Sequence, residues 1–257
     1  MTDRIPKAKA LAERLLGVAL DVVGEAQVTL DENWARNPKV VGLTLLSRSL
    51  TNFRAAMLLL NDRHVHIVEA RVLARCIYEN LIWIGALRER GSDFVKEMLD
   101  DEAANRQALG ELTLRISRNL GGDVNDENGL TLRGLIKSTS ERFPGSKKLH
   151  VNKVAESTVV GSAYAEYSRL SLEAVHCSIT ALGRHLEREA VEGGYVLTVN
   201  VHPDPTPREV LDVLVHLCRS LLWIAITANE LVGFTSKSDL LRTLSEEFDQ
   251  MAENGSP

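Results

Sequence analysis

Aromatic residues, proline and cysteine are all scarce in this chain of 257 residues. Phe, Trp and Tyr together make up 5% of the sequence, and it contains 7 prolines. The three cysteines, Cys76, Cys177 and Cys218, lie far apart within apolar runs. This spacing indicates neither a disulfide framework nor a zinc motif, and it favours a reducing, cytoplasmic environment.

Long hydrophobic runs and an excess of positive charge are also missing. The longest uncharged apolar stretches, residues 80–87 and 220–229, are much shorter than the roughly 20 residues of a membrane span. Charges interrupt the apolar residues at the N-terminus, which disfavours a signal peptide. A formal net charge of −5 disfavours a nucleic-acid partner without excluding one. We therefore expect a soluble protein with no membrane partner.

Several common enzyme motifs are absent from the sequence. There is no GxxxxGKS, no GxGxxG after a strand, no GxSxG and no HExxH. These absences argue against the enzyme classes that such motifs define, and they leave any cofactor unknown.

What the chain does contain is helical periodicity, with abundant Leu, Ala, Glu and Arg. It predicts an all-α fold, a bundle of about seven helices in one domain covering residues 1–257. The core is expected at about residues 38–232, with the N-terminal helix and a short C-terminal helix packed on it and a frayed tail at 250–257. The expected helices span about residues 8–30, 38–61, 65–90, 93–119, 130–143, 159–189 and 207–233, with a short one from about 239.

Local signals refine this pattern. Asn37 and Pro38 suit the N-cap and first turn of the second helix, and Thr206 with Glu209 predicts a capping box for the last long one. YVLTVNV at residues 195–201 alternates like a strand, so we expect at most a short β-hairpin near 190–201. The basic loop at 144–153 favours a solvated surface over a phosphate-binding patch.

Two polar clusters interrupt the apolar helices. Arg71, Arg75 and Glu79 are spaced four apart along one helical face, with Tyr78 beside them. A carboxylate in this apolar run would be costly to bury without a partner, and Arg75 is the natural one. The cluster is therefore either a structural ion pair or part of a ligand site.

The second cluster consists of Arg169, Glu173 and His176, whose spacing aligns them on one side of a helix. Ser171 and Tyr167 lie close enough in sequence to complete a polar pocket. His176 at the edge of the core is either a packing residue or a ligand. His216 and Arg219 on the last long helix are similarly open.

The segments VEARVLARCIYENLIWIGAL and, a hundred residues later, YSRLSLEAVHCS resemble a bacterial family known as domain of unknown function 5677. The resemblance covers about residues 38–232 and implies an all-α bundle with no established activity. It also implies a site made of Arg71 or Arg75, Glu79, Ser171 and His176.

These residues support a binding or sensing module in which Arg75, Glu79 and His176 hold a small ligand or a metal, or only fix the packing. A second hypothesis is an enzyme, because Arg169 and His176 form an RxxxxxxH arrangement resembling the helical nucleases called HEPN. There His176 would act as the general base and Arg169 would stabilise the transition-state phosphate. A purely structural or interaction scaffold is the third.

A metal site is a further alternative. His64, His66 and Glu69 offer nitrogen and oxygen ligands near the start of a helix. Two histidines separated by one residue point about 200° apart in a helix, so they chelate together only if the segment is extended. Exposed histidines are the simpler interpretation. If the protein forms a homodimer, we expect its peripheral helices to mediate it.

Overall fold

A computed structural model of the protein describes residues 4–29, 34–175, 179–201 and 203–253. It is 75% helical, which confirms the predicted all-α class. The elements are α1 (Arg4–Glu25), η1 (Trp34–Arg36), α2 (Pro38–Asn61), α3 (Ile67–Arg90), α4 (Ser92–Asn119), α5 (Glu127–Arg142), α6 (Val151–Glu156), α7 (Ala163–Leu170), η2 (Ser171–Val175), α8 (Ile179–Gly183), β1 (Leu186–Val191), β2 (Gly194–Val199), α9 (Pro207–Val232) and α10 (Ser238–Glu253).

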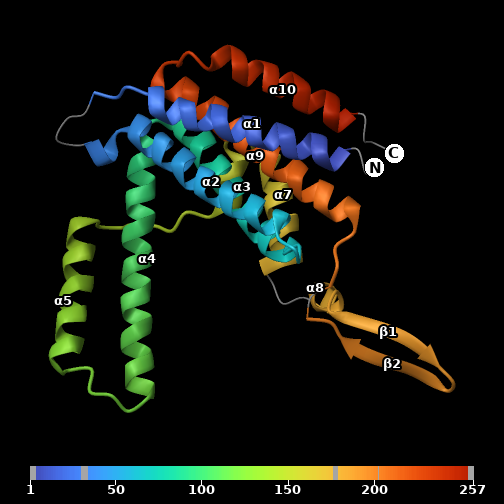
Figure 1. Cartoon of the computed structure of the whole chain (residues 1–257). Helices are drawn as coiled ribbons and strands as arrows, with labels where there is room; N and C mark the ends of the chain where they lie inside the picture. Colours follow the sequence, from blue (N-terminus) through green and yellow to red (C-terminus); the bar gives the residue numbers. More distant parts are fainter. Residues whose placement is uncertain (1–3, 30–33, 176–178, 202, 254–257) are drawn as a thin grey trace.

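The core of the bundle lies where α2, α3 and α9 pack together, with α1 across α2 and α9 and α10 across α1 and α9 (Figure 1). Phe53 from α2, Ile84 from α3 and Leu214 from α9 are all inaccessible to solvent. Burial of such apolar side chains is the main driving force for folding. α3 lies at the centre of the bundle, where it contacts α2, α9, α7, α6 and α4.

Helix α9 has the length and hydropathy of a membrane span. Its most apolar stretch is 72% buried within the bundle, as in a core helix. The capping box predicted at Thr206 and Glu209 starts this helix, and Gly233 ends it in the left-handed conformation, with φ of 94°. Asn37 caps α2 by accepting a hydrogen bond from the Lys39 amide. Both caps are therefore as the sequence predicts.

α4 and α5 form an antiparallel pair that extends away from the bundle (Figure 1). We call this pair the α4–α5 arm. Gly110 lets α5 approach closely, because a Cβ there would lie 2.8 Å from the Ile136 side chain. Few residues of α4 are buried, as expected for a helix with a charged sequence at the edge of the bundle.

The helix predicted over residues 159–189 is wrong in its second half. Helix α7 begins at Ala163 and passes into the π-helical turn η2 after Leu170, and beyond Val175 the described residues resume at Ile179 with the short α8. Leu172 and Val175 are 61% and 44% exposed, so these two apolar side chains add little to the core.

The predicted hairpin is present, but its first strand begins at Leu186, earlier than expected. β1 and β2 pair antiparallel from Leu186 opposite Val199 to Val191 opposite Gly194. Gly193 provides the positive φ, 86°, that the tight turn requires. All twelve strand residues are exposed, and the hairpin projects from the bundle (Figure 1).

Candidate functional site

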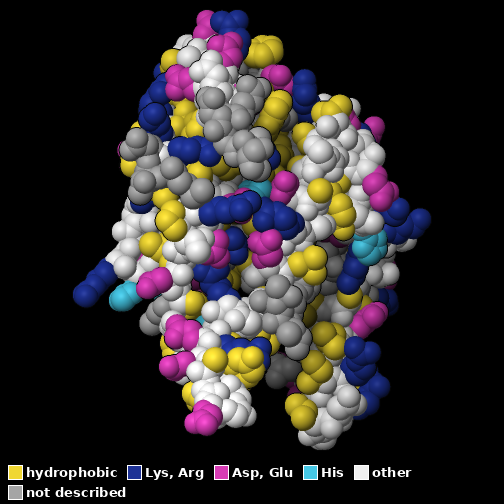
Figure 2. Space-filling model, turned by 90° about the vertical axis from the view of Figure 1, so that its right-hand side faces the viewer, with side chains coloured by type: hydrophobic (Ala, Val, Ile, Leu, Met, Phe, Trp, Pro, Cys, Tyr) yellow, Lys and Arg dark blue, Asp and Glu magenta, His cyan; other side chains and the backbone are white. Residues whose placement is uncertain are grey.

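A network of ion pairs joins α3, α7, η2 and α9 where they meet. We call it the α3–α7–α9 network; it contains Arg71, Arg75, Tyr78, Glu79, Glu166, Tyr167, Arg169, Ser171, Glu173, Glu209, Asp212 and His216, with Arg184 from the segment that follows α8. Basic and acidic side chains gather side by side in the middle of the face seen in Figure 2. The structure thus brings together most residues of the two predicted clusters.

Arg75 links the first predicted cluster to the second. Its Nε donates to the Ser171 hydroxyl at 2.8 Å, and Nη2 donates to the Tyr167 hydroxyl at 2.5 Å. Nη1 lies 3.5 Å from the carboxylate of Glu79, the partner expected from the four-residue spacing. The guanidinium also lies 4.5 Å from the centre of the Tyr167 ring, a favourable cation–π distance.

Arg169 is surrounded by carboxylates. Glu173 lies 3.0 Å, Glu166 3.2 Å and Asp212 3.4 Å from its nitrogens. Burial opposes the charged form of Arg169, but the charge of Asp212 and the bonds to the two glutamates raise its pKa above the ordinary value. Its side chain also contacts Nε2 of His216.

His216 is the buried centre of this end of the network, with a side chain that is 5% exposed. Its Nδ1 lies 3.1 Å from the Tyr78 hydroxyl, and its Nε2 lies 3.4 Å from Asp212 and 3.7 Å from Glu166. Burial would raise the pKa of Asp212, but hydrogen bonding and charge from His216, with the charge of Arg169, lower it. The four-residue spacing of Asp212 and His216 was the only signal in the sequence for this pair.

The opposite end of the network is less complete. Nε of Arg71 and Oε2 of Glu173 face each other at 3.6 Å, and both are buried without a hydrogen-bond partner among the described residues. Arg71 also lies 3.9 Å from Glu209, which is held more tightly by Arg184 at 2.5 Å. Four arginines therefore face five carboxylates across the whole network, which leaves no surplus of positive charge.

Four predicted site residues are not among the residues of the network. His176 lies outside the described residues, so the structure does not test the RxxxxxxH pair with Arg169. His64, His66 and Glu69 lie around the start of α3, where His64 and Glu69 are exposed and His66 is half-buried. Among the described ranges, no group of three or more His, Cys, Asp or Glu side chains is arranged to hold a metal ion.

A cleft of about 400 Å³ opens beside the network, between α3, α9 and the segment from residue 159 into α7. Tyr78 and Glu166 belong to both the network and the cleft wall. Burial raises the pKa of Tyr78 far above its ordinary value, so its hydroxyl stays protonated at neutral pH. Leu81, Trp223 and Ile226 contribute apolar surface to the cleft.

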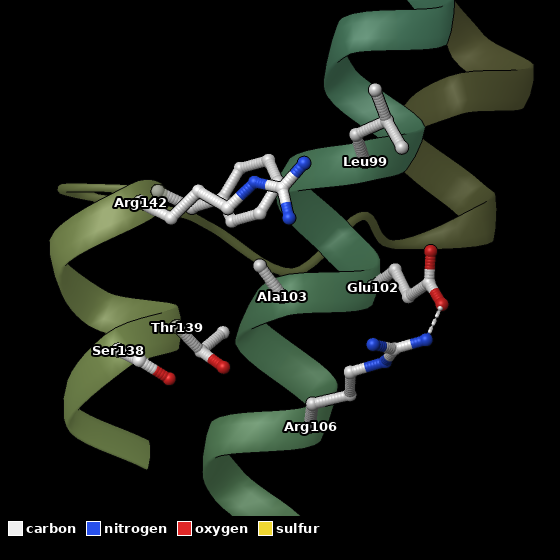
Figure 3. Close-up of a pocket in the computed structure, with 8 residues that line it drawn as sticks. Leu99, Glu102, Ala103, Arg106, Ser138, Thr139 and Arg142 are labelled. Carbon is white, nitrogen blue, oxygen red and sulfur yellow. Dashed lines mark hydrogen bonds and ion pairs between the residues drawn. The ribbon is translucent and has the colours of Figure 1, made fainter. Parts of the chain in front are cut away.

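A second hollow, of about 360 Å³, lies between the two helices of the α4–α5 arm (Figure 3). Its lining comes from α4, α5 and Phe143, and Arg142 reaches over it from the end of α5. The Glu102–Arg106 pair at its edge is 2.5 Å long, with side chains 55% and 72% exposed. Such exposed pairs are screened by water, which makes this hollow the weaker candidate.

The fold and the site together define a helical bundle with a semi-buried Arg, Glu and His network beside a cleft. The sequence matches the family of unknown function DUF5677 over residues 39–195, and the chain belongs to that family. This confirms the resemblance found in the sequence, over a range that ends before α9. No curated protein and no solved structure gives a significant match.

Proposed function

We propose that this protein is a binding or sensing module that takes a small organic ligand in the cleft between α3, α7 and α9. The main support for this proposal is that Tyr78 and Glu166 belong both to the cleft wall and to the α3–α7–α9 network. The cleft volume lies in the range of small-molecule sites, and its apolar walls with a few polar groups match their usual composition.

The network gives this cleft a rigid polar wall. Tyr78 is held by His216, which in turn contacts Asp212, and Glu166 is held by Arg169. Side chains fixed in this way lose little conformational entropy when a ligand binds. The network therefore pre-organises the groups that would orient the ligand.

The HEPN-like ribonuclease receives less support from the same geometry. An RNA phosphate at Arg169 would have to compete with Glu166, Glu173 and Asp212, which already surround the guanidinium. A like charge brought next to three carboxylates is repelled. A purely structural network predicts that no ligand binds in the cleft, so the binding experiment below distinguishes it from the proposed binding module.

The test uses N-phenyl-1-naphthylamine, an uncharged dye whose fluorescence rises in apolar surroundings. We expect the full-length protein to bind it, and Ile226→Trp, which fills the cleft, to weaken binding at least about tenfold. Leu58→Trp is the matched control, because Leu58 is 73% exposed on α2 and lies outside the cleft lining. Circular dichroism confirms that both variants remain folded.

Absence of dye binding, or equal binding by both variants, would show that the cleft is not a ligand site. Incubation with single-stranded RNA provides the other arm of the test. Cleavage that is lost in Arg169→Ala and in His176→Ala would replace the binding proposal with the ribonuclease.

A further inference from the structure

The charged side chains that line the cleft indicate which class of ligand it binds, and this inference rests on the proposed function. We propose that the ligand is an amphipathic anion whose acid group is bound by Arg219 and whose apolar part lies along α9.

Arg219 differs from the other charged side chains of the cleft, which are each paired with a group of opposite charge. The lining contains two arginines and two glutamates, Arg88, Arg219, Glu166 and Glu230. Arg88 is paired with Glu230 at 2.7 Å, and Glu166 is paired with Arg169 at 3.2 Å. Within the described ranges, Arg219 forms no ion pair with a carboxylate. A partly buried guanidinium without a counter-ion favours binding of a carboxylate or a phosphate.

The surroundings of Arg219 leave this charge available. Its guanidinium carbon lies 5.7 Å from the centre of the Phe248 ring, on the side of α10. Arg219 also interacts with the hydroxyl of Tyr78. The positive charge of Arg219 favours ionisation of Tyr78, but burial has the larger effect and keeps the pKa of that phenol raised. Tyr78 therefore adds no negative charge at neutral pH that would compete with an incoming acid.

The shape of the cleft indicates an elongated ligand. Arg219, Trp223, Ile226 and Glu230 follow one another along α9 at steps of four, three and four residues, so they line one side of the helix. At a rise of 1.5 Å per residue, the eleven steps from Arg219 to Glu230 span about 16 Å. The Arg88–Glu230 pair closes the far end.

The middle of the cleft is apolar. Trp223, which is 46% exposed, and Ile226 form one wall, while Leu81, Val160 and Ala163 form the others. Removing the apolar part of a ligand from water against these side chains is favourable in proportion to the area buried. The cleft therefore matches a molecule with one acid group and an extended hydrocarbon or aromatic portion.

The experiment compares two dyes that share one aromatic skeleton. 8-Anilino-1-naphthalenesulfonate differs from N-phenyl-1-naphthylamine by a single sulfonate, so the ratio of their dissociation constants measures recognition of the anion. We expect the full-length protein to bind the sulfonate about tenfold more tightly than the neutral dye. Arg219→Gln should bring the two constants close together, mainly by weakening the sulfonate.

Arg242→Gln is the matched control for net charge. Arg242 lies on α10, its side chain is 71% exposed, and it does not line the cleft. The variant should keep the tenfold preference, because a surface charge outside the cleft is screened by salt.

The outcomes separate this inference from the proposed function. Binding of both dyes with equal affinity, or an equal loss for both in Arg219→Gln, would overturn the anion inference and leave the ligand site intact. Failure of both dyes to bind would show that the cleft is not a ligand site and would overturn the proposed function as well.

Competition identifies the acid. Displacement of the sulfonate dye by decanoate points to a carboxylate ligand, and displacement by decyl phosphate points to a phosphate monoester; either supports the proposal. Displacement by decanol alone would overturn it.

Discussion

The α3–α7–α9 network and the α4–α5 arm both contain arginine–carboxylate pairs, but in different surroundings. In the arm, Arg106 and Glu102 lie 2.5 Å apart on one exposed helix surface. In the network, Arg169 lies at 3.0 to 3.4 Å from three carboxylates that come from two segments, and its side chain is 38% exposed. The shorter pair is the less important one for stability, because water screens it. Burial and the number of partners, not distance, decide what such a pair contributes.

The largest expected difference comes from removing the arginine in each region. Arg169→Ala leaves Glu166, Glu173 and Asp212 facing one another, and we expect a loss of about 2–4 kcal/mol in the free energy of unfolding, below the full cost of a buried pair because the site is partly exposed. Arg106→Ala in the arm should cost less than about 0.5 kcal/mol. Urea denaturation of both variants measures the two values. Equal losses would show that the network is no more than a set of surface pairs.

Glycine substitutions sharpen the same contrast. A Cβ at Gly85 of α3 would lie 2.4 Å from Cγ2 of Val160, so Gly85→Ala must displace the segment that walls the cleft, at about 1–3 kcal/mol. At Gly134 of α5 nothing lies within 4 Å, and Gly134→Ala should stabilise the helix by up to about 1 kcal/mol. Thermal unfolding reports both shifts, and opposite signs are expected. A shift of the same sign in both variants contradicts the close packing of Val160 on α3.

The smallest effect concerns pH. The folded-state pKa of Asp212 is lowered, so its contribution is fully present above the unfolded value of about 3.9 and is lost as the pH falls through the folded value. Asp212→Asn should therefore flatten the dependence of unfolding free energy on pH below about pH 4.

Asp93, at the start of the arm, provides the control for this measurement. A hydrogen bond and the charge of Lys96 lower its pKa at a fully exposed position. In 0.5 M NaCl the effect of Asp93→Asn should disappear while that of Asp212→Asn persists, because salt screens exposed charges more strongly. Disappearance of both would mean that the network is open to solvent.

Features of the fold that depend on near neighbours in the chain could be predicted from the sequence. Asn37 and Thr206 cap their helices through side chains that act within three residues, so both helix starts were predictable. The four-residue spacing of Arg75 and Glu79 likewise placed them in contact on one helix face. The hydrophobic periodicity was sufficient for the all-α class.

Contacts between helices, and the site that these contacts form, could be seen only in the tertiary structure. His216 joins Tyr78 across 138 positions of sequence, and Arg75 joins Ser171 across 96, so no local pattern could reveal either contact. The helix after Leu170 gives way to a π turn in which Leu172 and Val175 are exposed, although the sequence predicts a continuous helix there. The role proposed for Arg219 likewise depends on packing, because the ion pair between two other charged side chains of the cleft joins different helices. Residue spacing fixes what lies on one face of a helix, while packing decides which face it meets.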